Sequence, residues 1–402
     1  MQSWERQKIR DLAKEKLEIS SLPEMQEKKR LWTLHNNCQT MMPVVHFEMD
    51  TVEDKGFRYQ CVCESDEARR IELALGNSMA NYKMVGDDTV VTPEFIVYPQ
   101  STFEAFSIPA KRVSTQGVGF HVEPVIEELS QVQSLLPAKI EFDMEGSLAW
   151  KDFVEEQIGD ILTVRMGMPS LEVSLTQSVV LRMGMENMFM AMYDTPEEFH
   201  IMMDRLSDDY IFYFKELEKR GMIYANNGND RLFQGSFGFT TDLPDKASKT
   251  TQCWGYMDSQ ETVGISPEMF DEFFFPYYKK VADQYGLLSY GCCEPVSGFW
   301  ERSLSRFTNL RKISISPWCD EEYMGEQLSG KKIIYHRKPS PNFVGVGEVL
   351  DEEGFRNHIR KTVRASKNCF LEISFRDVYN LNGNLDKPRR AVEITRQELE
   401  NR

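Results

Sequence analysis

Apolar residues recur at helical spacing through the first 36 residues, where Ile9, Leu12 and Ile19 stand among charged positions and Pro23 interrupts the pattern. The same signals predict helices over 66–80, 184–192, 196–220, 266–285, 296–306, 320–328, 351–366 and 389–399. Runs rich in β-branched and aromatic residues predict strands over 43–47, 222–226, 287–291, 312–316, 332–336 and 370–374. Extended segments are expected over 89–98 and 112–121.

Strands that alternate with helices at short intervals indicate an α/β protein with a parallel sheet. The number of expected strands approaches eight, which favours a (β/α)8 TIM barrel over a doubly wound sheet. No glycine-rich dinucleotide motif or phosphate-binding loop follows any of these strands. We therefore expect an N-terminal helical extension over 1–40 and a single barrel over 41–402, with an insertion within about 51–160.

Composition restricts the function. The 402 residues carry a formal net charge of −16, which argues against binding to nucleic acid or to an anionic membrane surface. No run approaches the roughly 20 apolar residues of a membrane helix, and the charged N-terminus lacks a secretion signal. The sequence thus predicts a cytoplasmic protein. Its eight cysteines are then expected to be thiols or metal ligands before disulfides.

In a barrel of this kind the catalytic and binding residues lie at the C-terminal ends of the strands. One such end carries Cys292, Cys293 and Glu294, which together offer soft and hard donors for zinc. Adjacent side chains of a strand point to opposite faces, so both thiols reach one metal only if the chain has already bent into its loop. The alternative is one small core residue and one idle thiol.

Other strand ends supply candidate catalytic and substrate-binding residues. His46 and Glu48 have a spacing of two and would face the same side, as an acid/base pair or as a plain hydrogen-bonded pair. The expected substrate-binding residues are Asp230, Phe233, Phe237, Trp254, Trp318 and Lys338, although aromatic residues are more often core and Lys338 also suits a solvated turn. No Gly-x-Ser-x-Gly or His-Glu-x-x-His motif is present, which removes the serine-hydrolase and zincin readings.

Several segments resemble the uroporphyrinogen decarboxylase (URO-D) superfamily of single (β/α)8 barrels, over residues 4–395. The similarity rests on Ser-Pro-Glu-Met-Phe at 266–270, Tyr-Gly-Cys-Cys-Glu-Pro at 290–295, Ile-Ser-Pro-Trp-Cys-Asp at 315–320 and Arg-Lys-Pro-Ser-Pro at 337–341. The superfamily includes the decarboxylase and zinc-dependent methyltransferases that work with corrinoid proteins. The last two segments look like an uncharacterised branch near the O-demethylases.

Departures from the family patterns distinguish between decarboxylation and methyl transfer. The decarboxylase places arginines after its first strand to hold the carboxylates of its substrate, whereas the segment 46–50 here is acidic and would repel them. In the methyltransferases the zinc ligands are a His-x-Cys after the sixth strand and a cysteine near the last one. Here that histidine is missing and Cys369 precedes the last strand, so the resemblance implies a shell rebuilt around Cys292, Cys293 and Glu294, with Glu372 or His336 as further candidates.

The sequence therefore predicts a metal-dependent methyltransferase that moves a methyl group from a small O-methyl or similar substrate to a corrinoid on a separate protein. The corrinoid would arrive on a partner because the chain has no Asp-x-His-x-x-Gly cobalamin motif. Zinc is the expected metal, acting as a Lewis acid. The alternatives are a decarboxylase of a tetrapyrrole and a non-catalytic barrel that binds a small molecule. A homodimer is compatible with the superfamily.

Overall fold

The main element of the fold is a parallel sheet of seven strands. A computed structural model describes residues 1–114, 120–130 and 132–400 of the chain. In spatial order the strands are β1 (Val44–Phe47), β15 (Phe370–Phe375), β14 (Ile334–Arg337), β13 (Leu310–Ile315), β12 (Leu287–Tyr290), β11 (Trp254–Met257) and β8 (Leu171–Val173). All six pairings are parallel, and most strand residues are buried because both faces of the sheet are covered. The predicted α/β class is confirmed.

Four smaller strand pairs complete the described sheets. One is parallel, β2 (Glu94–Val97) with β7 (Thr163–Met166). The antiparallel pairs are β3 (Gln100–Glu104) with β6 (Lys139–Asp143), β4 (Arg112–Ser114) with β5 (Phe120–Val122), and β9 (Arg231–Leu232) with β10 (Ser236–Phe237). Strand hydrogen bonds in the described residues end at β1 on one side and at β8 on the other. They show a parallel α/β sheet, and closure into an eight-stranded barrel stays a prediction.

The outer edge of β1 is sealed by two carboxylates instead of by another strand. The backbone amide of Val45 donates to Asp88 Oδ2 at 2.8 Å, and that of Phe47 donates to Asp87 Oδ2 at 2.8 Å. The amide of Asp88 in turn donates to the Val45 carbonyl at 2.9 Å. The edge amides of β1 are thus satisfied within the chain, which removes a template for pairing with another molecule.

Two expected elements are wrong as predicted. Residues 222–226 form no strand, and the side chain of Asn226 pairs with the start of β11 instead. Its amide nitrogen donates to the Pro169 and Trp254 carbonyls at 3.1 Å each, and its oxygen accepts from the Trp254 amide at 2.8 Å. The helix expected over 296–306 is reduced to two 3-10 turns, Val296–Gly298 and Leu304–Arg306.

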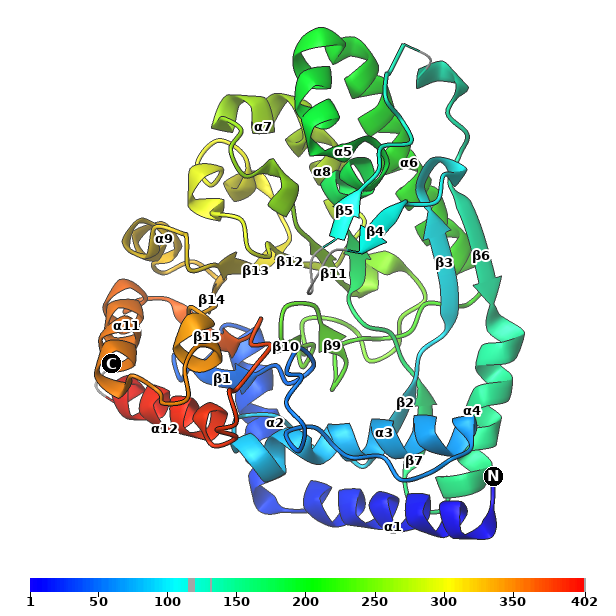
Figure 1. Cartoon of the computed structure of the whole chain (residues 1–402), viewed down its shortest axis with the longest axis vertical. Coiled ribbons are helices and arrows are strands. Elements are labelled where there is room, and N and C mark those ends of the chain that lie inside the picture. Colours follow the sequence, from blue (N-terminus) through cyan, green and yellow to red (C-terminus); the bar gives the residue numbers. More distant parts are fainter. Residues whose placement is uncertain (115–119, 131, 401–402) are drawn as a thin grey trace.

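Helices surround most of the seven-stranded sheet, whereas the β3–β6 pair lies at the periphery (Figure 1). They are α1 (Ser3–Ser20), α2 (Pro23–Asn36), α3 (Asp66–Ala80), α4 (Met144–Ile158), α5 (Leu175–Asp194), α6 (Pro196–Lys219), α7 (Pro267–Phe273), α8 (Phe275–Ala282), α9 (Glu321–Leu328), α10 (Asn342–Gly345), α11 (Glu352–Ala365) and α12 (Lys387–Leu399). The single helix expected over 266–285 is divided at Phe274, because Pro276 lacks an amide hydrogen and its ring excludes a continuous helix. No helix of the described residues is both long and apolar enough to cross a membrane.

The hydrophobic core has one large and one smaller part. The large part lies around the seven-stranded sheet and its helices. The smaller one joins α1, α3 and α4 to the β2–β7 pair through residues such as Ile9, Leu75, Val97, Val154 and Val164. The N-terminal helix therefore packs on the segment expected to be an insertion. The domain limits drawn from the sequence stay a prediction.

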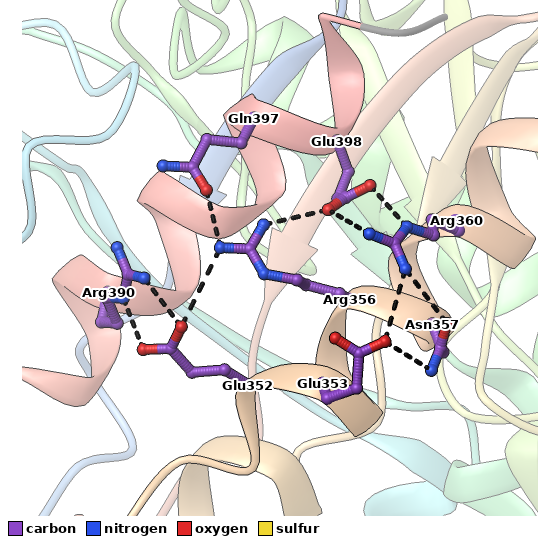
Figure 2. Close-up of polar contacts among 8 residues, drawn as sticks. All are labelled: Glu352, Glu353, Arg356, Asn357, Arg360, Arg390, Gln397 and Glu398. Atoms are coloured by element: carbon purple, nitrogen blue, oxygen red, sulfur yellow. Dashed lines mark hydrogen bonds and ion pairs between the residues drawn. The ribbon is translucent and has the colours of Figure 1, made fainter.

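An ion-pair network fixes α12 on α11 (Figure 2). Arg390 donates twice to Glu352, at 2.7 Å to each carboxylate oxygen. Glu398 accepts from Arg356 at 3.0 Å and from Arg360 at 2.8 Å. Several charges that share partners in this way hold two helices together better than isolated surface pairs do.

Candidate functional site at the strand ends

The polar side chains that end the parallel strands meet at one edge of the sheet. Glu48 follows β1, the Cys292–Cys293 pair follows β12, Lys338 follows β14 and Arg376 follows β15. The carboxyl ends of parallel strands are where α/β proteins place their reacting groups. Of the residues predicted from the sequence, Glu48, Cys292, Cys293 and Lys338 belong to one connected site, which Arg376, not predicted, completes.

The two adjacent thiols lie on the same side of the chain. Their Sγ atoms are 3.5 Å apart. The bend that allows this occurs at Gly291, whose φ of +99° suits glycine and whose hypothetical Cβ would lie 3.0 Å from Ser314 Cβ. The bend required for both thiols to face one point is thus present.

The two thiols differ in acidity. The Cys292 thiol lies within hydrogen-bonding distance of Cys293, and this contact raises the pKa of Cys292, with burial adding to the effect. The same hydrogen bond lowers the pKa of Cys293, and nearby Lys338 and Arg376 act in the same direction. Burial and Asp377 oppose this lowering. Cys293 is therefore the more acidic thiol of the pair, with Cys292 as its hydrogen-bond partner.

Glu294 does not point to the thiols as a third ligand. Its two carboxylate oxygens accept hydrogen bonds from the backbone amides of Ser259, at 3.0 Å, and Cys292, at 2.8 Å. The side chain is fully buried, and burial together with the charge of Asp258 raises its pKa to about 7. Glu294 thus joins the loop after β11 to the loop after β12.

The described residues do not fit a zinc shell. Two thiolates on one zinc ion lie about 3.7 Å apart, close to the separation of the pair here. However, in the described ranges no three His, Cys, Asp or Glu side chains converge as ligands. Glu372 and His336, the further candidates, lie in a buried cluster inside the sheet, where Glu372 accepts from Lys312 at 2.6 Å and His336 lies 3.4 Å from Glu372.

Arg376 connects the ends of β1 and β15. Its Nε lies 3.1 Å from Glu48 Oε2, and its Nη2 lies 3.4 Å from Asp377 Oδ1. Burial disfavours the guanidinium, but Glu48 and Asp377 outweigh it and raise the pKa of Arg376. Asp377 has a φ of +58° and places Oδ2 at 3.9 Å from Cys293 Sγ. Strain of this kind is concentrated at functional sites.

Lys338 positions the thiol loop. Its Nζ donates to Gln234 Oε1 at 2.6 Å and to the Cys292 carbonyl at 3.1 Å. Burial lowers its pKa. The fully buried ammonium therefore fastens the thiol loop to the loop between β9 and β10, which corrects the solvated-turn alternative for this residue.

A separate pocket of about 310 Å³ lies between the start of β8, the C-terminal half of α6 and Phe233. Phe233 lines it and stacks on Tyr256 with ring centroids 5.3 Å apart. The Tyr256 hydroxyl donates to Asp258 at 2.6 Å, and Asp258 accepts a second bond from Ser174 at 2.7 Å. Phe233 thus lines a pocket, and its role in substrate binding stays a prediction.

His46 and Asp230 are committed to other partners. The His46 ring is buried, with Nδ1 3.0 Å from Asp87 Oδ2. Asp230 lies 3.1 Å from Arg165, on the β2–β7 side of the molecule. Neither residue contacts Glu48 or the thiols, since His46 pairs with Asp87 and Asp230 pairs with Arg165.

The remaining predicted aromatic residues do not line the pocket. Trp254 begins β11, is fully buried and donates from Nε1 to the Gly238 carbonyl at 2.9 Å. Phe237 packs edge-on against Trp32 at a centroid distance of 5.4 Å. Trp318 is 68% exposed on the loop after β13. Trp254 and Phe237 are therefore buried core residues and do not line the pocket.

Sequence reasoning missed Glu172, Tyr256 and Asp258. All three depend on β8 and β11, short strands that were not predicted. The signal for β11 was present, since Trp-Gly-Tyr-Met-Asp at 254–258 is a short apolar and aromatic run that ends in a carboxylate.

Comparisons with known proteins add one likeness. No protein-family model matches the chain, and no curated protein matches it in sequence. Among solved structures, the chain is similar to a methyltransferase from Methanosarcina mazei, with 9% sequence identity and a TM-score of 0.48, over 92% of this chain and 97% of that one.

Proposed function

We propose that this chain is a methyltransferase of URO-D type, a closed (β/α)8 barrel that transfers a methyl group from a small donor to a corrinoid carried by a separate protein. The observation that carries the proposal is the Cys292–Cys293 pair, two thiols 3.5 Å apart at the C-terminal end of a parallel strand, where the pKa of Cys293 is lowered by its neighbour. The resemblance of segments 266–270 and 290–295 supports the superfamily.

The chain's own residues bind the donor and shape its electrostatic surroundings. A methyl group moves as an electron-poor carbon, and the bonding electron pair stays on the donor heteroatom. The carboxylate of Asp258, and Cys293 whenever its thiol is ionised, place negative charge at the strand ends, and this charge stabilises the electron-poor carbon during its transfer. A corrinoid supplies the nucleophile that accepts the methyl group. Phe233 and Tyr256 limit the access of water.

The test is a methyl-transfer assay with the purified full chain, chemically reduced cobalamin and a panel of methoxyaromatic and methylamine donors. Formation of methylcobalamin, followed by its absorbance, is the expected result. Cys293→Ser should reduce the rate about 100-fold or more if the thiolate acts at the reacting centre. The control is Cys61→Ser, because the serine hydroxyl can keep the hydrogen bond that Cys61 donates to Glu72 at 2.8 Å. Equal rates in both variants would refute the role of Cys293.

Zinc stays a sequence-based proposal, and no step above depends on it. Elemental analysis of protein prepared without chelator tests it directly. About one zinc per chain, lost in Cys292→Ala and Cys293→Ala, would show that the two thiols recruit further ligands. A zinc content that these substitutions leave unchanged would remove the pair from any metal site.

A tetrapyrrole decarboxylase is the second candidate, and one observation favours it. The acidic segment 46–50 was expected to repel a polycarboxylate. Its charges are neutralised, because Glu48 pairs with Arg376 and Asp50 pairs with Arg231. Turnover of uroporphyrinogen by the purified chain, with no methyl transfer, would establish this candidate. Absence of both activities would leave the non-catalytic binding protein.

A further inference from the structure

The pocket lined by Phe233 combines aromatic walls with one carboxylate. It lies between β8, α6 and the loop before β10, and its aromatic residues are Tyr213, Phe214 and Phe233. Its serines are occupied, since Ser101 and Tyr213 share a hydrogen bond of 2.6 Å and Ser170 accepts from the Phe233 amide at 3.1 Å. Glu172 is the one acidic residue of the lining.

Glu172 lacks a compensating charge. Among the residues that the structure describes, no hydrogen bond or ion pair reaches its carboxylate. The one charge acting on it is that of Asp258, which is negative. Asp258 itself is held by Ser174 and Tyr256 and is not free to move away. Glu172 is an exposed residue, yet partial desolvation by its neighbours and this repulsion raise the pKa of Glu172 to about 7.

We infer that this pocket binds an organic cation, a methylated ammonium group, with Glu172 as its counter-ion and the aromatic rings around its methyl groups. Aromatic faces attract a diffuse cation through their negative potential, and quaternary ammonium groups are recognised in this way. A volume of about 310 Å³ suits a small molecule. An anionic ligand would be repelled by Glu172 and Asp258 together.

The inference rests on the proposed function and gives the chemical class of its methyl donor. In a quaternary ammonium donor the C–N bond breaks, its electron pair stays on nitrogen, and the methyl carbon forms a new bond with the electron pair of the reduced corrinoid. The leaving group is a neutral amine, so no proton has to be supplied. Loss of the positive charge also ends the attraction to Glu172, which favours release of the product.

Two probes of nearly equal shape test the inference. Choline and its carbon isostere 3,3-dimethylbutan-1-ol differ by one positive charge, and their binding to the full chain is measured by calorimetry at pH 8.5 and constant ionic strength. Choline should bind about tenfold more tightly or better. Glu172→Gln should abolish that preference and leave the binding of the isostere unchanged, which also shows that the variant is folded. Glu268→Gln, at an exposed carboxylate outside the pocket, is the matched control.

Phe233→Leu provides a second, independent variant. It keeps an apolar wall but removes one aromatic face, so choline should bind several-fold more weakly and the isostere nearly as before. Equal binding of the two probes, binding of neither, or a preference that survives Glu172→Gln would overturn the inference. Choline binding without methyl transfer would instead refute the proposed function, whereas transfer from methoxyaromatic donors without choline binding would refute the cation site.

Discussion

Glu294 allows the electrostatics of the site to be tested without knowledge of the substrate. The side chain is fully buried, and its carboxylate is held by two backbone amides. Burial and Asp258 raise its pKa from the ordinary value of 4.5 to about 7. The perturbation is Glu294→Gln, which keeps the shape and removes the titration.

The sign and size of the effect follow from proton linkage. Between pH 4.5 and 7 the folded state holds a proton that the unfolded state has released, so stability falls as the pH rises through this window. From pH 5 to pH 8 the loss attributable to Glu294 is about 2–3 kcal/mol. The glutamine leaves one of the two amides without an acceptor, which costs about 1–2 kcal/mol at either pH. The variant should therefore be less stable than the unmodified protein at pH 5, and the gap should close or reverse at pH 8.

The assay is urea unfolding of both proteins at pH 5 and pH 8. Groups that titrate elsewhere contribute equally to both proteins and cancel in the difference between them. Glu268→Gln is the control, because the pKa of this exposed carboxyl is lowered and it stays ionised over the whole range. A gap between Glu294→Gln and the unmodified protein that is the same at the two pH values would refute the account of Glu294 as a buried acid with a raised pKa.

Three further predictions concern other parts of the structure. Cys292→Ala should slow the alkylation of Cys293 by iodoacetamide at pH 7 about threefold to tenfold, because the hydrogen bond that stabilises the thiolate is lost; an unchanged rate would contradict the assignment of the two thiols. Asn226→Ala should lower the free energy of unfolding by about 2–4 kcal/mol in urea titrations, since three buried backbone groups lose their partner, and a loss below about 1 kcal/mol would argue against its role in place of a strand. A double-mutant cycle of Arg356→Ala and Glu398→Ala should give a coupling of about 1 kcal/mol in the free energy of unfolding, and high salt should weaken it. Zero coupling would show that this ion pair does not stabilise the fold.

The elements with a strong local signal were predictable from sequence. The helix expected over 66–80 is α3 with the same limits, and the strands of the last 120 residues are β12 to β15 within two residues. The sequence predicted that a helix starts at Gly184. In the structure α5 already begins at Leu175, and Gly184, with a φ of +76°, is a kink within it. Strands β8 and β11 escaped prediction because three or four residues between polar segments carry little periodicity.

The candidate site was less predictable, because its geometry depends on turns and on register. Cys292 and Cys293 were found from residue type alone, but their shared orientation depends on the bend at Gly291. Glu294 was expected beside them and is instead turned toward two backbone amides. The pair Glu48–Arg376 exists because β1 and β15 are neighbours, a pairing between residues more than 300 positions apart that no local pattern contains.

The acidity of the chain acquires a different meaning once its charges are paired. From sequence, the segment 46–50 was the element that would reject an anionic substrate, yet Arg376 and Arg231 neutralise Glu48 and Asp50 there. Among the described residues Glu172 has no such partner, and this exposed carboxylate lines a pocket with aromatic walls. Selection by charge should therefore operate in the pocket and not at the end of β1. Substitutions that remove Glu172 should change which ligands bind, whereas removal of Asp50 should leave ligand choice unaltered.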